Sequence, residues 1–160
     1  METLKRDWNR AVARLIAGFG SPTDVVNASA NWLTVPAAPD ALVALASLSS
    51  SDLVEIRKEE MYALIDQVYS GTGGRPPEDE IILTAALSLL YPGQDDRQVL
   101  ETARLLAQIS RSYPSLSQIM VRFDSGLDYY DDGLSGALGS LREDIEDLRR
   151  ELTDRHPVLE

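Results

Sequence analysis

Residues 134–152 read LSGALGSLREDIEDLRREL, and they carry the most regular hydrophobic pattern in the chain. Apolar side chains recur there in steps of four and three, the spacing of a helix with one apolar stripe. Charged residues fill most of the positions between them. The stripe consists of Leu134, Leu138, Leu141, Ile145, Leu148 and Leu152.

This stripe has two interpretations. A heptad-like seam is typical of a coiled coil, so the six residues are a candidate seam for a homo-oligomer. A terminal helix that packs on its own domain shows the same pattern over three heptads, and we favour this interpretation. In both cases the sequence predicts a long, acidic C-terminal helix that closes at His156-Pro157.

The rest of the chain is also patterned as helices. Ser21, followed by Pro22 and Asp24, has the features of a helix start, and Asp95 is expected to cap another helix. Asp52 is expected to cap a single longer helix that runs through Val68. No stretch alternates with a period of two for long enough to require a sheet. The expected helices before the last one cover residues 3–19, 21–33, 40–48, 52–68, 78–91, 95–111 and 114–123.

These patterns predict an all-α fold. We expect residues 1–160 to form a single domain of about seven or eight helices, packed as an irregular or orthogonal bundle. The helices around residues 81–91 and 99–109 are expected to be the buried ones, because apolar residues dominate them. The Gly- and Pro-rich segment 71–77 is a predicted loop and a candidate hinge.

Charge and composition restrict the classes of partner. The chain has 15 basic and 26 acidic residues, a net charge of −11, which argues against direct binding to a nucleic-acid backbone. Such a charge favours basic protein surfaces instead. The N-terminus is charged where a signal peptide needs an apolar core, and no apolar run has the length of a membrane span. We therefore predict a cytoplasmic protein that does not bind membranes.

The residues needed for common catalytic or metal sites are scarce. There is no cysteine, and the single histidine, His156, lies beside a proline near the C-terminus. The glycine-rich segment 71–75 lacks the Lys-Ser/Thr ending of a phosphate-binding loop. An EF-hand register from Asp128 to Gly139 fails, because Tyr130 occupies the third position and the last position is not Glu. We predict neither enzymatic activity nor a cofactor.

Residues 124–133, DSGLDYYDDG, are the best candidate for a surface that meets a partner. Tyrosines anchor many protein interfaces, and the flanking carboxylates would attract Arg or Lys side chains. A structural interpretation is equally favoured, in which one Tyr packs inward and Asp131 or Asp132 caps the last helix. The candidate binding residues are Asp124, Asp128, Tyr129, Tyr130, Asp131 and Asp132.

Two further segments have a distinctive order of motifs. The first is ASANWL at 28–33 followed by ALVALASL at 41–48, then Asp52 and a helix that ends near Tyr69, and the second runs from Pro114 to Asp128 before an acidic helix. Together they resemble small helical bacterial proteins of the immunity type. The resemblance implies neutralisation of a basic toxin or nuclease by an acidic surface. It implies no role for individual residues.

Three other functions are compatible with the same residues. A structural or phage-type assembly protein would oligomerise through the C-terminal helix. A DNA mimic would present carboxylates in place of phosphates to a nucleic-acid-binding protein. An enzyme would use the same carboxylates to hold a divalent metal ion, in a non-standard metal site at 124–133.

Overall fold

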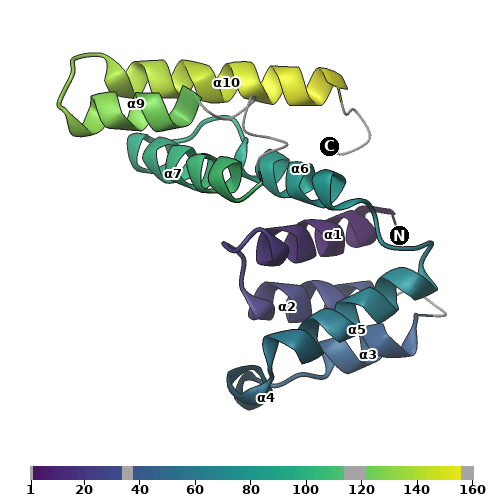
Figure 1. Ribbon diagram of the computed structural model, residues 1–160. Coiled ribbons are helices and arrows are strands. Elements are labelled where there is room, and N and C mark those ends of the chain that lie inside the picture. The colour runs from purple at the N-terminus through teal and green to yellow at the C-terminus, as the bar shows by residue number, and fades with distance from the viewer. Residues whose placement is uncertain (1, 34–37, 114–121, 156–160) are drawn as a thin grey trace. The chain divides into compact units, whose positions relative to one another are not determined.

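A computed structural model of the chain describes residues 2–33, 38–113 and 122–155 (Figure 1). These residues form nine helices and no strand, which confirms the all-α prediction. Most of the helix predicted over 114–123, and His156, lie outside the described residues. The helices are α1 (Glu2–Ile16), α2 (Pro22–Trp32), α3 (Asp40–Ala46), α4 (Ser50–Glu55), α5 (Lys58–Gly71), α6 (Glu78–Leu89), α7 (Asp96–Ser112), α9 (Arg122–Asp131) and α10 (Ala137–Arg155).

The chain divides into two compact units, Met1–Ile81 and Ile82–Glu160, with the boundary inside α6. Segment 71–77 lies before this boundary, in the first unit. Residues 72–77 form a loop, as predicted, while Gly71 is the last residue of α5. The action of the segment as a hinge stays a prediction. The two units are described separately below.

The core of the first unit surrounds Trp8 of α1. Its ring lies 5.5 Å from the ring of Trp32 and 5.1 Å from that of Tyr69, so α1, α2 and α5 meet at one aromatic cluster. The indole Nε1 of Trp8 donates a hydrogen bond to Ser29 Oγ at 3.0 Å, and Ser29 Oγ donates to the Val25 carbonyl at 2.7 Å. The buried indole N–H therefore has a partner, as burial of a polar group requires.

Local signals fix the junction between α1 and α2. Gly18 adopts a φ of 95°, where glycine has no steric penalty, and Phe19 N donates to the Arg14 carbonyl at 3.2 Å. The first helix was expected to reach Phe19, but α1 ends at Ile16 because the residues after it form this closing turn. Ser21 then caps α2, as predicted, by accepting from Asp24 N at 3.2 Å.

The single helix expected from Asp52 is wrong. Ser49 is the N-cap, and Asp52 lies three residues on, in a capping box, with its carboxylate accepting from Ser49 N at 2.8 Å. The short helix α4 then ends because Ile56 and Arg57 adopt extended backbone, with ψ of 132° and 148°. Because of this break, Met61 and the rest of the apolar stripe of α5 face the core, while α4 buries no residue.

In the second unit, α7, α9 and α10 pack against one another, and α9 and α10 form a helical hairpin (Figure 1). Asp95 caps α7 as predicted, in a capping box with Gln98. The predicted burial of residues 81–91 and 99–109 is confirmed for most of their apolar side chains, but Tyr91 is 45% exposed. Those buried are Ile81, Ile82, Leu83, Ala85, Ala86, Leu89, Leu90, Val99, Ala103, Leu106, Ala107 and Ile109.

The C-terminal helix α10 begins at Ala137 and is 19 residues long. Four residues of the candidate seam are buried within the unit, where α10 lies against α7 and α9: Leu141, Ile145, Leu148 and Leu152. Leu138 is half-buried, and Leu134 lies before the helix, 55% exposed. An oligomer built on the four buried residues would require α10 to leave its neighbours.

Candidate protein-binding surface

The candidate binding residues lie on a helix and the turn that follows it. Helix α9 runs from Arg122 to Asp131, and Asp132 and Gly133 continue into the turn. The alternative capping role of Asp131 or Asp132 is wrong, because α10 begins only at Ala137. Neither aspartate is therefore placed next to the first turn of α10.

Helical spacing separates the acidic side chains from the buried ones. Phe123 and Leu127, one turn apart, are buried towards the interior of the second unit. Asp124, Asp128 and Asp131 follow each other in steps of four and three, so they form a stripe on a different face of α9. The aspartates thus form one row, as a surface that attracts basic side chains needs.

The two tyrosines point in different directions. Successive residues of a helix are rotated by about 100°, so Tyr129 and Tyr130 cannot share one face. Tyr129 is turned away from the buried residues and is 55% exposed, whereas Tyr130 lies towards the buried side and is 37% exposed. Sequence reasoning treated them as an equal pair, but the structure makes Tyr129 the more accessible anchor.

The end of α9 holds Leu134 near Tyr129. Gly133 adopts a φ of 73°, Gly133 N donates to the Tyr130 carbonyl at 2.9 Å, and Leu134 N donates to the Tyr129 carbonyl at 3.0 Å. This pair of bonds is a Schellman motif, which brings the residue after the glycine back over the last helical turn. Leu134 is 55% exposed, so a second apolar side chain belongs to this surface.

Sequence reasoning had assigned Leu134 to the last helix and missed it as a surface residue. The signal that identifies it is Gly133, which ends α9 and reverses the chain. We refer to the exposed residues around this turn as the α9 C-terminal surface. Its members are Asp128, Tyr129, Asp131, Asp132 and Leu134.

Asp124 serves a different purpose from the other aspartates. Its carboxylate pairs with the Arg111 guanidinium at the end of α7, and this contact ties α9 to α7. The hydrogen bond to Asp124 and its charge raise the pKa of Arg111, with a smaller contribution from Asp128. Asp124 is therefore engaged within the unit and is a weaker candidate for a partner contact than Asp128.

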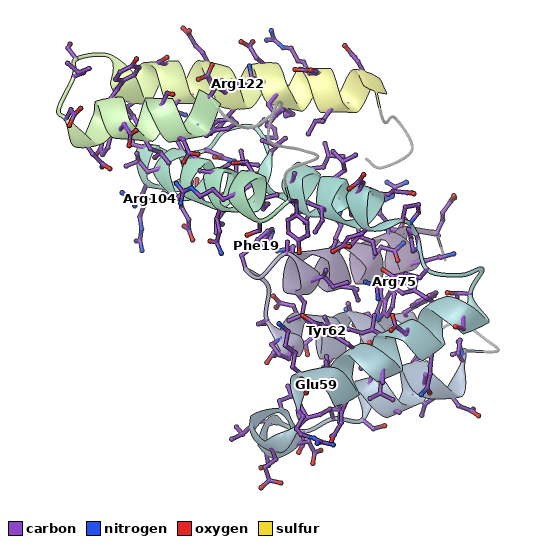
Figure 2. All side chains as sticks on the ribbon, viewed as in Figure 1. Phe19, Glu59, Tyr62, Arg75, Arg104 and Arg122 are labelled. Carbon is purple, nitrogen blue, oxygen red and sulfur yellow. The ribbon has the colours of Figure 1, made fainter. Side chains whose placement is uncertain are left out.

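A second arginine supports the far side of the hairpin. Arg122 at the start of α9 lies 3.7 Å from the Glu151 carboxylate of α10, and its guanidinium is 5.9 Å from the Phe123 ring centre (Figure 2). These contacts join the two helices away from the α9 C-terminal surface. The helix that carries the surface is thus held at both ends, by Arg122 and by the Gly133 turn.

Two other properties of the described residues concern metal ions and membranes. Within residues 2–33, 38–113 and 122–155, no three His, Cys, Asp or Glu side chains gather closely enough to hold a metal ion. Among the helices described here, none is both long enough and apolar enough to cross a bilayer.

Comparison with models of protein families, with curated proteins and with solved structures gives no match for this chain.

Proposed function

We propose that this chain is a non-catalytic protein-binding module that docks on a basic protein through the α9 C-terminal surface. The observation that carries this proposal is the exposure of Tyr129 and Leu134 at the same end of α9 as the exposed carboxylates of Asp128, Asp131 and Asp132. An apolar centre with a charged rim is the usual organisation of a protein interface. Apolar side chains that gather on an exposed surface and are rimmed by polar residues often mark an interaction site.

The physical steps of docking follow from the surface. The net charge of −11 and the row of aspartates attract a basic partner over a distance of about 10 Å at moderate salt. Tyr129 and Leu134 then enter apolar recesses of the partner. Tyr129 has only two side-chain dihedrals to fix, and the Schellman motif holds Leu134, so little conformational freedom is lost on binding.

The nature of the partner extends this proposal. A resemblance to immunity-type proteins favours a toxin or nuclease whose active site is basic, and the chain would neutralise it by covering that site. Cytoplasmic location belongs to the same proposal, since an immunity protein acts where its toxin would. A DNA-binding protein as partner would instead favour the DNA-mimic function.

The test compares partner capture by matched variants. Tyr129→Ala removes the exposed anchor, and Tyr91→Ala is its control, because Tyr91 is 45% exposed but lies outside the surface. Each immobilised protein is incubated with host extract, and retained proteins are identified by mass spectrometry. The captured partner is then purified and titrated by calorimetry. We expect Tyr129→Ala to weaken binding by roughly tenfold or more and Tyr91→Ala to leave it unchanged.

A second pair of variants tests the charge. Asp128→Asn with Asp131→Asn and Asp132→Asn should slow association and reduce its salt dependence. The control replaces Glu55, Glu59 and Glu101 by Gln, which removes the same charge elsewhere. If the two triple variants had equal effects, only the net charge of the protein, and not the position of the three aspartates, would control association. Unchanged affinity of Tyr129→Ala would place the interface elsewhere and contradict the proposal.

A further inference from the structure

The first unit contains a groove that the acidic surface does not explain. It lies between the turn that ends α1 and the break between α4 and α5, and its volume is about 320 Å³. Such a volume is at the lower end of the roughly 300–1,000 Å³ of small-molecule sites. Its floor is apolar and consists of Leu15, Leu53, Ile56 and Met61.

Cations line this groove, although the chain is acidic. Arg57 and Lys58 contribute to the wall, and none of the residues that line the groove carries a carboxylate, although Arg57 pairs with Glu60 next to it. On the other side of Ile56, a second hollow is lined by Asp52, Glu55 and Glu60. The cations therefore line the groove and the carboxylates line the other hollow, with Ile56 in both walls and the Arg57–Glu60 ion pair between them.

The two cations keep donors for a ligand. Arg57 Nε donates to Glu60 Oε1 at 2.8 Å, which uses one of the five N–H donors of the guanidinium. The ammonium of Lys58 lies 5.4 Å from the Tyr62 ring centre, so a cation and an aromatic face meet at the wall. Tyr62 and Glu59 both lie on α5 (Figure 2). Tyr62 lines the groove, whereas Glu59 does not.

We propose that this groove binds a small amphipathic carboxylate, with its apolar body on the floor and its carboxylate at Arg57 and Lys58. The apolar floor suits the body of such a molecule, and the cationic wall, whose lining holds no carboxylate, suits its charged end. Charge-assisted hydrogen bonds from Arg or Lys to a carboxylate are stronger than neutral ones. A neutral molecule of the same shape lacks the charge-assisted hydrogen bonds to Arg57 and Lys58. A short anion lacks the apolar contacts with the floor.

The test uses octanoate, octan-1-ol and acetate as probes of the full chain. Backbone amide resonances of the protein are followed during each titration. We expect octanoate to shift resonances around Ile56 and Met61, and to bind roughly tenfold more tightly than octan-1-ol or acetate. Arg57→Gln with Lys58→Gln should reduce octanoate affinity to that of octan-1-ol.

The control variant is Arg97→Gln with Arg104→Gln, which removes two exposed arginines of α7 and changes the net charge equally. It should bind octanoate as the wild type does, and thermal melts should show that both variants fold. Equal affinity for octanoate and octan-1-ol, or unchanged octanoate binding after loss of Arg57 and Lys58, would overturn the proposal. So would failure of octanoate to bind while an acidic peptide with an aromatic residue shifts the same resonances, since the groove would then serve a protein partner.

Discussion

At the scale of single residues, the burial of Tyr69 makes the stability of the fold depend on pH. Its side chain is 4% exposed and packs edge-on against Trp8. Burial raises the pKa of Tyr69 to about 12, an effect that Arg75 opposes and that Asp66 and Glu80 reinforce. The neutral phenol is therefore favoured in the folded state over the unfolded one.

Because the folded pKa is higher than the unfolded value, Tyr69 contributes stability that is complete below about pH 10 and falls as the pH rises towards 12. We expect the free energy of unfolding of the wild type to drop between about pH 9 and 11.5, by about 2 kcal/mol more than that of Tyr69→Phe. Urea denaturation at several pH values measures this difference. The two proteins differ at this one side chain, so parallel curves would mean that Tyr69 is not protected from water.

At the scale of helices, the α9–α10 hairpin depends on close approach at Gly126. A Cβ atom at Gly126 would lie 2.6 Å from Leu141 Cδ2 and 3.4 Å from Leu141 Cγ, and Leu141 is fully buried. Gly139 of α10 faces open space. The two glycines therefore separate the effect of packing from that of helix propensity.

We expect Gly126→Ala to destabilise the protein by about 1–3 kcal/mol, because the overpacking exceeds the gain in helix propensity. Gly139→Ala should stabilise it by up to about 1 kcal/mol, since an exposed helical glycine is replaced without a clash. Chemical denaturation of both variants gives the comparison. Stabilisation by both alanines would show that α9 and α10 do not pack as closely as described.

The same elements show which features the sequence could predict. Ser21 and Asp95 are predictable as caps because the signal is local. Each accepts a hydrogen bond from the backbone N–H of the residue three positions on. The break at Ile56-Arg57 has no glycine or proline, and it depends on turning the apolar stripe of α5 towards the core. Long-range packing of this kind is not encoded in a local pattern.

The candidate surface was predictable in composition but not in geometry. Asp128, Asp131 and the tyrosines were selected because acidic and aromatic residues concentrate there. Their separation onto different faces follows only from the helical conformation of α9, which has two buried residues and depends on neighbouring helices. The role of Leu134 could not be found, because its spacing also continued the apolar stripe of α10.

At the scale of the whole molecule, the two interpretations of the apolar stripe make opposite predictions. If α10 packs within its unit, Leu148 is a core residue, and it is fully buried. Leu148→Asp would then place an unpaired carboxylate in the core and cost more than about 4 kcal/mol. If the stripe joins copies of the chain, the same change would separate a folded oligomer into folded monomers.

We expect Leu148→Asp to lose helical circular dichroism and its cooperative melt, whereas Leu134→Asp, at an exposed position, keeps both. Light scattering of the folded proteins completes the comparison, with 17.6 kDa as the mass of one chain. Leu134→Asp should have the same mass as the wild type. A Leu148→Asp variant that stays folded at the monomer mass, beside a wild type of twice that mass, would instead assign the stripe to an interface between copies. An assembly protein would then be favoured over the proposed docking function, because the apolar stripe of α10 would join copies of the chain.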